Sequence, residues 1–171
     1  MTPELKTARL TLRPVRADDA PRMTALLGDF DIARMTTSIP HPFALKDAED
    51  FLERVEAGDP DREAVFALDA GEGLAGVLGF HHKDGVGPEI GYWLGRPYWG
   101  QGLMSEAAGA AMDWAGEAWR KRVVVSGHFA DNPASGQVLV KAGFLYTGEV
   151  QHRHSKARGE TAATRMMVWL P

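Results

Sequence analysis

Apolar and polar residues alternate with two different periods along this chain, and the change of period separates predicted strands from predicted helices. Alternation with a period of two, β-branched runs and flanking turn residues predict seven strands. These strands cover residues 10–15, 64–68, 74–82, 89–94, 123–125, 145–150 and 163–170. Glycine-bearing turns at 69–73 and 84–87 join three of the strands, so both connections are predicted to be hairpins.

Four other segments show the three-to-four-residue spacing of a helix. They lie after Asp18 or Asp19, around residues 47–55, from Gln101 to about Trp119, and from Asn132 to Gly143. In the last segment, proline at the first position and glycine at the end are typical helix boundaries. The order of elements predicts an α/β fold with a mixed, mostly antiparallel sheet of about six to seven strands flanked by about four helices. A single domain over residues 1–171 is expected.

The composition is that of an ordinary globular protein, and it narrows the possible chemistry. The 171 residues are 44% hydrophobic and 25% charged, and no apolar run is long enough to cross a membrane. The absence of cysteine excludes a disulfide, a thiolate metal site and a cysteine-bound acyl intermediate. A net charge of −4 argues against a nucleic-acid partner. The N-terminus lacks the apolar core of a signal peptide, which predicts a cytoplasmic location.

A strand, a short glycine-bearing loop and a helix start follow one another in residues 90–107. Free backbone N–H groups at a helix start form a site for a phosphate-bearing ligand, and glycines let such a ligand approach the main chain. A purely structural left-handed turn explains the same glycines equally well. A dinucleotide-binding fingerprint is a third interpretation, since Gly100, Gly102 and Ser105 nearly complete G-x-G-x-x-G. That motif, however, normally opens a domain, whereas this stretch follows two hairpins.

A second stretch, residues 130–144, has the sequence ADNPASGQVLVKAGF and contains N-x-x-S and K-x-G-F. Together with the first stretch, it resembles the GNAT superfamily of acetyl-CoA-dependent N-acetyltransferases. Residues 7–14 and 89–102 are similar to the branch of ribosomal-protein N-terminal alanine and serine acetyltransferases. The resemblance covers nearly the whole chain. It implies a GNAT-like domain with the acetyl-CoA site at a V-shaped opening between the central strands.

The resemblance also implies how acetyl-CoA is held. The pyrophosphate is bound by the backbone amides of Gln101, Gly102, Leu103, Met104 and Ser105. Trp93 and Leu94 pair with the pantetheine arm, whose amides mimic another strand. Asn132 matches a position near the pantetheine, and a simple helix cap explains it equally well. Lys141 is a candidate for the 3′-phosphate of CoA, with stabilisation of the helix C-terminus as its other interpretation.

Direct transfer needs an acceptor for the amine proton and a proton or hydrogen bond for the departing thiolate. Many members of the superfamily place a tyrosine seven residues after the asparagine, where this chain has Leu139. Ser135 is therefore the candidate to hydrogen-bond or protonate the departing sulfur. Its alternative interpretation is an ordinary serine at a helix start that bonds to the backbone. Glu89 is the candidate base that accepts the amine proton. Its alternative interpretation is an exposed carboxylate beside a hairpin. His81 or His82 is a further candidate, since only one of two adjacent strand residues can face the cleft.

No motif in the sequence specifies the acceptor. The resemblance implies a primary amine, in particular an N-terminal α-amine of a ribosomal or other protein, bound by the first two helices and the loops at 36–43 and 152–160. A small-molecule amine and a non-catalytic acyl-CoA-binding module are the alternatives. A homodimer is an expectation from the branch, and no nucleic acid or membrane partner is expected. No metal is expected either, since His152 and His154 lack a third ligand.

Overall fold

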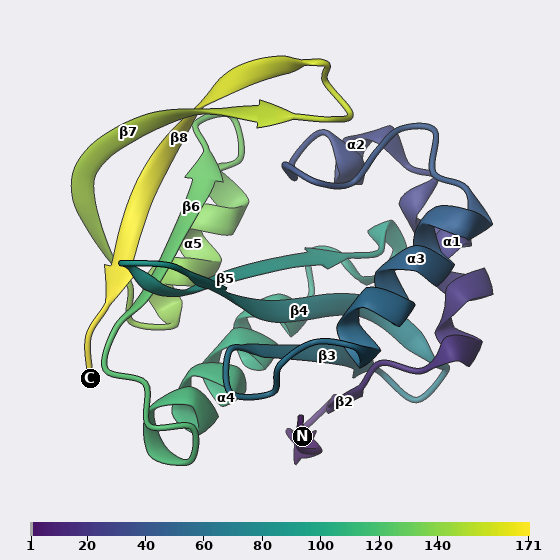
Figure 1. The fold of residues 1–171 in the computed structure, drawn as a ribbon, viewed down its shortest axis with the longest axis horizontal. Helices are drawn as coiled ribbons and strands as arrows, with labels where there is room; N and C mark the ends of the chain where they lie inside the picture. Colours follow the sequence, from purple (N-terminus) through teal and green to yellow (C-terminus); the bar gives the residue numbers. More distant parts are fainter. Residues whose placement is uncertain (1) are drawn as a thin grey trace.

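One sheet of eight strands organises the protein in a computed structural model that describes residues 2–171 (Figure 1). The strands are β1 (Leu5–Lys6), β2 (Thr11–Pro14), β3 (Glu63–Asp69), β4 (Leu74–Lys83), β5 (Gly87–Leu94), β6 (Val124–Phe129), β7 (Leu145–Ser155) and β8 (Glu160–Trp169). Their order is β1-β2-β3-β4-β5-β6-β8-β7, and every neighbouring pair is antiparallel except β5 and β6. The predicted mixed, mostly antiparallel sheet is confirmed, with the two-residue strand β1 as an addition.

Five α-helices flank this sheet over the described residues. They are α1 (Ala20–Leu27), α2 (Phe30–Ala33), α3 (Leu45–Glu56), α4 (Leu103–Glu117) and α5 (Pro133–Lys141), with 3₁₀ turns η1 (Ala17–Asp19) and η2 (Arg96–Tyr98). The four predicted helices are present, and α2 is the addition because a single turn is too short to show a helical period. None of the helices within residues 2–171 is long and apolar enough to span a membrane.

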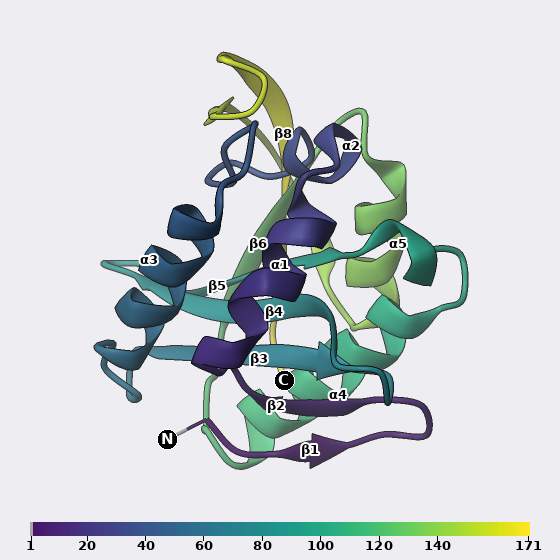
Figure 2. The ribbon, with the colours of Figure 1, turned by 90° about the vertical axis from the view of Figure 1, so that its right-hand side faces the viewer.

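Alternating residues of the central strands supply two separate hydrophobic cores. Val65, Ala67 and Val77 pack with the buried side chains of α1 and α3 on one face. Phe66 and Phe80 pack with those of α4 on the other. Figure 2 shows α1 and α3 on one side of the sheet and α4 on the opposite side. Because β3 is buried on both faces at residues 64–68, these five residues are apolar without a break, and only its two ends, Glu63 and Asp69, are charged.

The sheet opens between β5 and β6. Within the described chain these strands pair only at Glu89 and Val125, and the Ser126 hydroxyl donates to the Ile90 carbonyl at 3.0 Å just beyond that point. Further along, β5 stays with β4 up to Leu94, while β6 stays with β8 up to Phe129. The facing edges of β5 and β6 therefore diverge and form the V-shaped opening that the resemblance implied.

The β7–β8 hairpin arches over one end of this opening, and its turn lies beside α2 (Figure 1). The Lys156 amide donates to the Thr37 carbonyl at 3.1 Å, and the Ser155 hydroxyl donates to the Thr36 carbonyl at 2.8 Å. Both strands extend further than predicted, since β7 continues through Ser155 and β8 begins at Glu160. The extra residues of β7, at 151–155, are all polar, so the sequence lacks the alternation of apolar and polar residues that marks a half-buried strand, although one side of this segment is partly buried.

Candidate active site

A cavity of about 1560 Å³ occupies the opening between β5 and β6. Its walls come from β4, β5 and β6, from the first turns of α4 and α5, from the loop around residues 34–43, and from the β7–β8 hairpin. The structure brings the sequence-predicted site residues together here, with Gln101 as the exception. Those that line the cavity are Glu89, Trp93, Leu94, Gly102, Leu103, Met104, Ser105, Asn132, Ser135 and Lys141.

The start of α4 presents main-chain donors to this cavity. Gly102 precedes the helix with a φ of 74°, a left-handed conformation that favours glycine. No side chain among the described residues caps this end, and the first backbone bond of the helix runs from the Glu106 amide to the Gly102 carbonyl. The amides of Leu103, Met104 and Ser105 therefore have no partner within the helix and add to the positive end of its dipole.

Arg9 fixes the loop that leads into α4. Its guanidinium donates to the Gln101 carbonyl at 2.7 Å and to the Glu106 carboxylate at 2.8 Å. Glu106 also accepts from the Thr7 hydroxyl at 2.5 Å, and the hydrogen bonds from Thr7 and Arg9 hold its pKa below the ordinary value against the effect of partial burial. The Gln101 carbonyl thus faces Arg9. This contact was not anticipated, although Thr7 and Arg9 belong to the opening segment that carried the family resemblance.

The start of α5 faces β5 across the cavity. The Asn132 side chain accepts from the Ser135 amide at 3.4 Å and caps the helix, so this reading of Asn132 is confirmed. The Tyr92 hydroxyl lies 2.8 Å from the Ser135 hydroxyl and 3.0 Å from the Ser135 carbonyl. Leu139 is fully buried in the core and has no access to the cavity. Tyr92 was missed because a tyrosine within an apolar strand looks like a packing residue.

A row of titratable side chains crosses β3, β4 and β5 on the face that carries α1 and α3. Glu63 is paired in register with His81, and His81 with Glu89. The His81 Nδ1 lies 2.6 Å from the Glu63 carboxylate, which also accepts from Arg54 at 2.7 Å. A neutral ring that donates through Nδ1 keeps Nε2 as an acceptor. The ring also lies over Gly79, where a Cβ would come within 3.1 Å of Nε2.

Glu89 ends that row at the point where β5 and β6 part. Arg153 donates to its carboxylate at 2.6 Å and 3.3 Å, and the Lys83 ammonium lies 2.5 Å away. Burial alone raises the pKa of Glu89, but the hydrogen bonds from Arg153 and Lys83 outweigh it, so the pKa is lowered. A carboxylate held by two cations stays ionised at neutral pH and is a weak proton acceptor.

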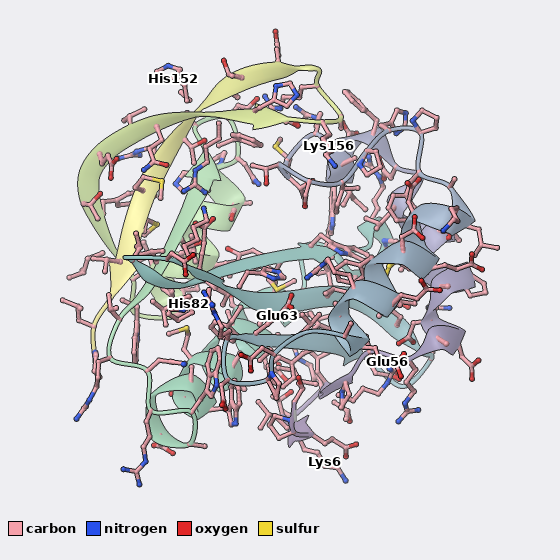
Figure 3. The ribbon with its side chains drawn as sticks, in the orientation of Figure 1. Lys6, Glu56, Glu63, His82, His152 and Lys156 are labelled. Carbon is pink, nitrogen blue, oxygen red and sulfur yellow. The ribbon has the colours of Figure 1, made fainter. Side chains whose placement is uncertain are left out.

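Of the four histidines named in the sequence analysis, two line the cavity and two lie outside it. His81 and His154 line the cavity, whereas His82 and His152 do not. Figure 3 labels His82 near the end of β4 and His152 on the outer side of the β7–β8 hairpin. The expectation that only one of the adjacent histidines faces the cleft is therefore confirmed. Over residues 2–171 there is no group of three or more His, Cys, Asp or Glu side chains that could hold a metal ion.

The cavity passes through the sheet from one face to the other. Tyr92 is paired with Leu78, whose side chain packs with the α4 core, so Tyr92 and Ser135 lie on that face. His81 and Glu89 lie on the opposite face, which α1 and α3 cover. A thioester placed in the opening between β5 and β6 would have a hydroxyl pair on one side and an imidazole on the other.

Comparison with known proteins places this architecture among acetyltransferases. The family model described as an acetyltransferase (GNAT) domain matches residues 9–145. The ribosomal-protein-serine acetyltransferase of Escherichia coli is 33% identical over 86 residues, which are 49% of this chain and 48% of that protein. An uncharacterized N-acetyltransferase of Bacillus licheniformis is 26% identical over 91% of this chain and 89% of its own length. The structure of Mycobacterium smegmatis RimJ in complex with CoA-disulfide has the same fold, with a TM-score of 0.83, 19% identity, and coverage of 94% of this chain and 81% of that chain.

Proposed function

Because the chain belongs to the GNAT acetyltransferase family, we propose that it moves the acetyl group of acetyl-CoA directly onto a primary amine, in particular a protein or peptide N-terminal α-amine. The observation that carries this proposal is the opening between β5 and β6, with unpaired helix amides on one face and a separate acceptor space on the other. We take residues 1–171 as one acetyltransferase domain, since strands from both ends of the chain join the same sheet.

The α4 face is suited to hold acetyl-CoA. The amides of Leu103, Met104 and Ser105 would bind the pyrophosphate, and Gly102 leaves room for it. The free edge of β5 at Trp93 and Leu94 would pair with the pantetheine amides. The Leu94 carbonyl already accepts from the Trp99 indole at 2.7 Å, so its second lone pair is the one left for the cofactor.

Two further predicted contacts keep a smaller role. Gln101 would act through its amide alone, because Arg9 occupies its carbonyl. Lys141 is the last residue of α5 and lines the cavity, which suits both the 3′-phosphate of CoA and the negative end of the helix.

The transfer forms a carbon–nitrogen bond and breaks the carbon–sulfur bond of the thioester. The amine nitrogen attacks the carbonyl carbon, one proton leaves the nitrogen, and one proton arrives at the departing thiolate. Ser135, at the α5 start, would hydrogen-bond the sulfur as negative charge develops there. With no cysteine in the chain, no thiol can carry the acetyl group between the two substrates.

His81 is better placed than Glu89 to take the proton of the amine. Its Nδ1 lies against the Glu63 carboxylate, a neutral ring that donates there would accept through Nε2, and the ring lines the cavity on the face that carries α1 and α3. Glu89 would instead attract the cationic form of the amine toward the opening, since its two ion pairs keep it ionised.

A peptide or protein acceptor is favoured by the curated relative named as a ribosomal-protein-serine acetyltransferase. The acceptor space lies between α1, the loop at 36–43 and the β7–β8 turn at 156–159, so a narrow chain end fits it better than a folded surface. A homodimer stays an expectation drawn from that branch.

Thiol release from acetyl-CoA by the purified chain tests the function. The panel combines short peptides that begin with serine, alanine or other residues, the same peptides with blocked N-termini, and small polyamines. We expect turnover with free N-terminal peptides and none with the blocked controls. Turnover with polyamines alone would reassign the acceptor to a small amine. Tight CoA binding without turnover on any amine would instead identify a non-catalytic binding module.

A further inference from the structure

We propose that Tyr92 is a positioning residue for Ser135, holding the serine hydroxyl so that its proton is directed at the sulfur of the departing CoA. This inference rests on the proposed acetyl transfer and assigns a second residue to its leaving-group side. Ser135 would be the catalytic residue that touches the sulfur, and Tyr92 acts through it.

The distances around the two hydroxyls allow two hydrogen-bond arrangements of the pair. The Tyr92 oxygen lies 3.0 Å from the Ser135 carbonyl and 2.8 Å from the Ser135 hydroxyl, and the phenol has a single proton to donate. If the phenol donates to the carbonyl, the serine proton turns back to the phenol oxygen. If the phenol donates to the serine oxygen, the serine proton is free to point into the cavity. The pair can therefore exchange a closed arrangement for an active one by rotating O–H bonds alone.

The heavy atoms of this pair are held from both sides. Tyr92 lies within β5, whose backbone pairs with β4 along its length. The α5 start is capped by Asn132 and packed tightly at Gly136, where a Cβ would lie 2.6 Å from the Tyr146 hydroxyl and 2.7 Å from the His128 imidazole. Donors fixed in this way need no reorganisation when charge develops, which is the condition for effective electrostatic stabilisation.

Tyr92 is suited to orient the serine and not to supply the proton. Burial raises the pKa of Tyr92 well above its ordinary value, so the phenol stays protonated and always has a proton to donate. The reaction releases one proton from the amine and consumes one at the thiolate, so its balance needs no proton from tyrosine. A serine hydroxyl that accepts from the phenol is a stronger donor to the sulfur, because linked hydrogen bonds polarise one another.

The placement also accounts for Leu139. Many superfamily members carry a tyrosine at the matching position of the helix, whereas here that side chain is a buried hydrocarbon of the core. In this chain the phenol that lies beside the start of α5 comes from β5, and Tyr92 lines the cavity, whereas Leu139 does not. The hydroxyl on the leaving-group side thus comes from a strand and a helix start together.

A double-mutant cycle tests this coupling with Tyr92→Phe, Ser135→Ala and the double variant, using the peptide that gives the highest wild-type turnover. We expect Tyr92→Phe to lower kcat about tenfold and Ser135→Ala to lower it about thirtyfold, with the KM for acetyl-CoA changed by less than about twofold. The double variant should match Ser135→Ala alone, since the phenol has no route to the sulfur once the serine is gone.

Tyr146→Phe is the matched control, because it removes a phenol oxygen that shares a hydrogen bond with the His128 imidazole instead of Ser135, and Tyr146 does not line the cavity. Its kcat should stay at the wild-type value, and both tyrosine variants should unfold cooperatively with similar small decreases in thermal midpoint, since each loses one phenol hydrogen bond. An unchanged kcat in Tyr92→Phe, or a double variant whose loss is the product of the two single losses, would overturn the inference while leaving acetyl transfer intact. A wild-type chain that turns over no amine would contradict the proposed function itself.

Discussion

The two faces of the sheet hold the two halves of the site, and they are built in different ways. On the α4 face the groups proposed to bind the cofactor are main-chain amides, a glycine loop and a strand edge, all between Tyr92 and Ser105 or at the start of α5. On the α1 and α3 face the cavity wall consists of side chains from segments far apart in the sequence, including residues 36–43, His81 and Arg153.

This difference suggests which side of the site members of the family share and which side can change from one member to another. Backbone donors at a helix start are set by the local backbone geometry and not by the chemistry of the side chains there, which at Leu103 and Met104 pack into the core. Side chains on the other face can be exchanged singly without disturbing the cofactor site. We therefore expect the acceptor site, and not the cofactor site, to differ from one member of the family to another.

The largest effect on the rate is expected from a substitution of His81, on the sheet face that carries α1 and α3 and the proposed acceptor space. Replacing it with alanine should lower kcat/KM at neutral pH by about a hundredfold, the contribution of a well-placed general base. The loss should shrink as the pH rises toward the pKa of the amine, because the solution then supplies the neutral amine and more hydroxide to accept the proton that leaves the nitrogen after attack. Steady-state rates across pH measure both effects.

The adjacent His82 is the control for that experiment. It lies outside the cavity, and His82→Ala should leave the rate unchanged (Figure 3). Equal effects of the two substitutions would remove the imidazole from the mechanism.

The next largest effect is expected from a substitution of Gly102, on the α4 face where we place the cofactor. A β-branched residue at a φ of 74° is strained, so Gly102→Val should raise the KM for acetyl-CoA. Strain of this kind corresponds to an increase in this KM on the order of thirtyfold. The KM for the peptide should stay the same. Gly85→Val places the same strain, at a φ of 79°, in the β4–β5 turn and should leave both KM values unchanged. A matching rise in the peptide KM would show that the two faces are not independent.

A smaller effect on the same face is expected from Arg9. Arg9→Ala removes the bonds to the Gln101 carbonyl and to Glu106, and should raise the KM for acetyl-CoA about threefold to fivefold, because the contact is half exposed. Calorimetric titration with CoA measures the same change without turnover. Arg120→Ala, which removes an arginine outside the cavity, is the control. A loss of kcat with unchanged CoA affinity would contradict the role given to Arg9.

The smallest effect on rate is expected from Glu89→Gln, since its low pKa makes it a poor base. The substitution should change kcat less than about fivefold but cost about 1–2 kcal/mol of unfolding free energy at pH 7, because Arg153 and Lys83 lose their partner. The folded pKa lies below the unfolded value of about 4.3, so this stabilisation is present above that pH and disappears as the pH falls through the folded pKa.

Denaturant unfolding of both forms between pH 7 and pH 2 should therefore give curves that converge in acid. A loss of kcat near a hundredfold in Glu89→Gln would restore the carboxylate as the base.

The sequence specified the sheet, the helices and the cofactor half because these depend on local patterns. The left-handed Gly102 and the capped start of α5 at Asn132 follow from a few adjacent residues. Strand β1 and helix α2 escaped prediction because two and four residues are too few to show a period.

The coupling of Tyr92 to Ser135 and of His81 to Glu63 could not be read from the chain, because each joins residues that only the sheet topology brings together. One signal for the first was present. The hydrocarbon at Leu139 left a hydroxyl role open, and Tyr92 is the tyrosine of the strand that was expected to pair with the pantetheine arm. For Glu89, no local pattern indicates that Lys83 and Arg153 would form ion pairs with its carboxylate.

The pairing of β6 with β8 has a consequence for when this protein becomes active during its synthesis. A chain leaves the ribosome from its N-terminus, so β5, α4 and β6 emerge well before residues 160–169. Until β8 arrives, β6 has no neighbour on its outer edge and pairs with β5 only at Glu89 and Val125. The second wall of the opening is therefore completed late, and we expect a nascent copy to be inactive until the β7–β8 hairpin has formed.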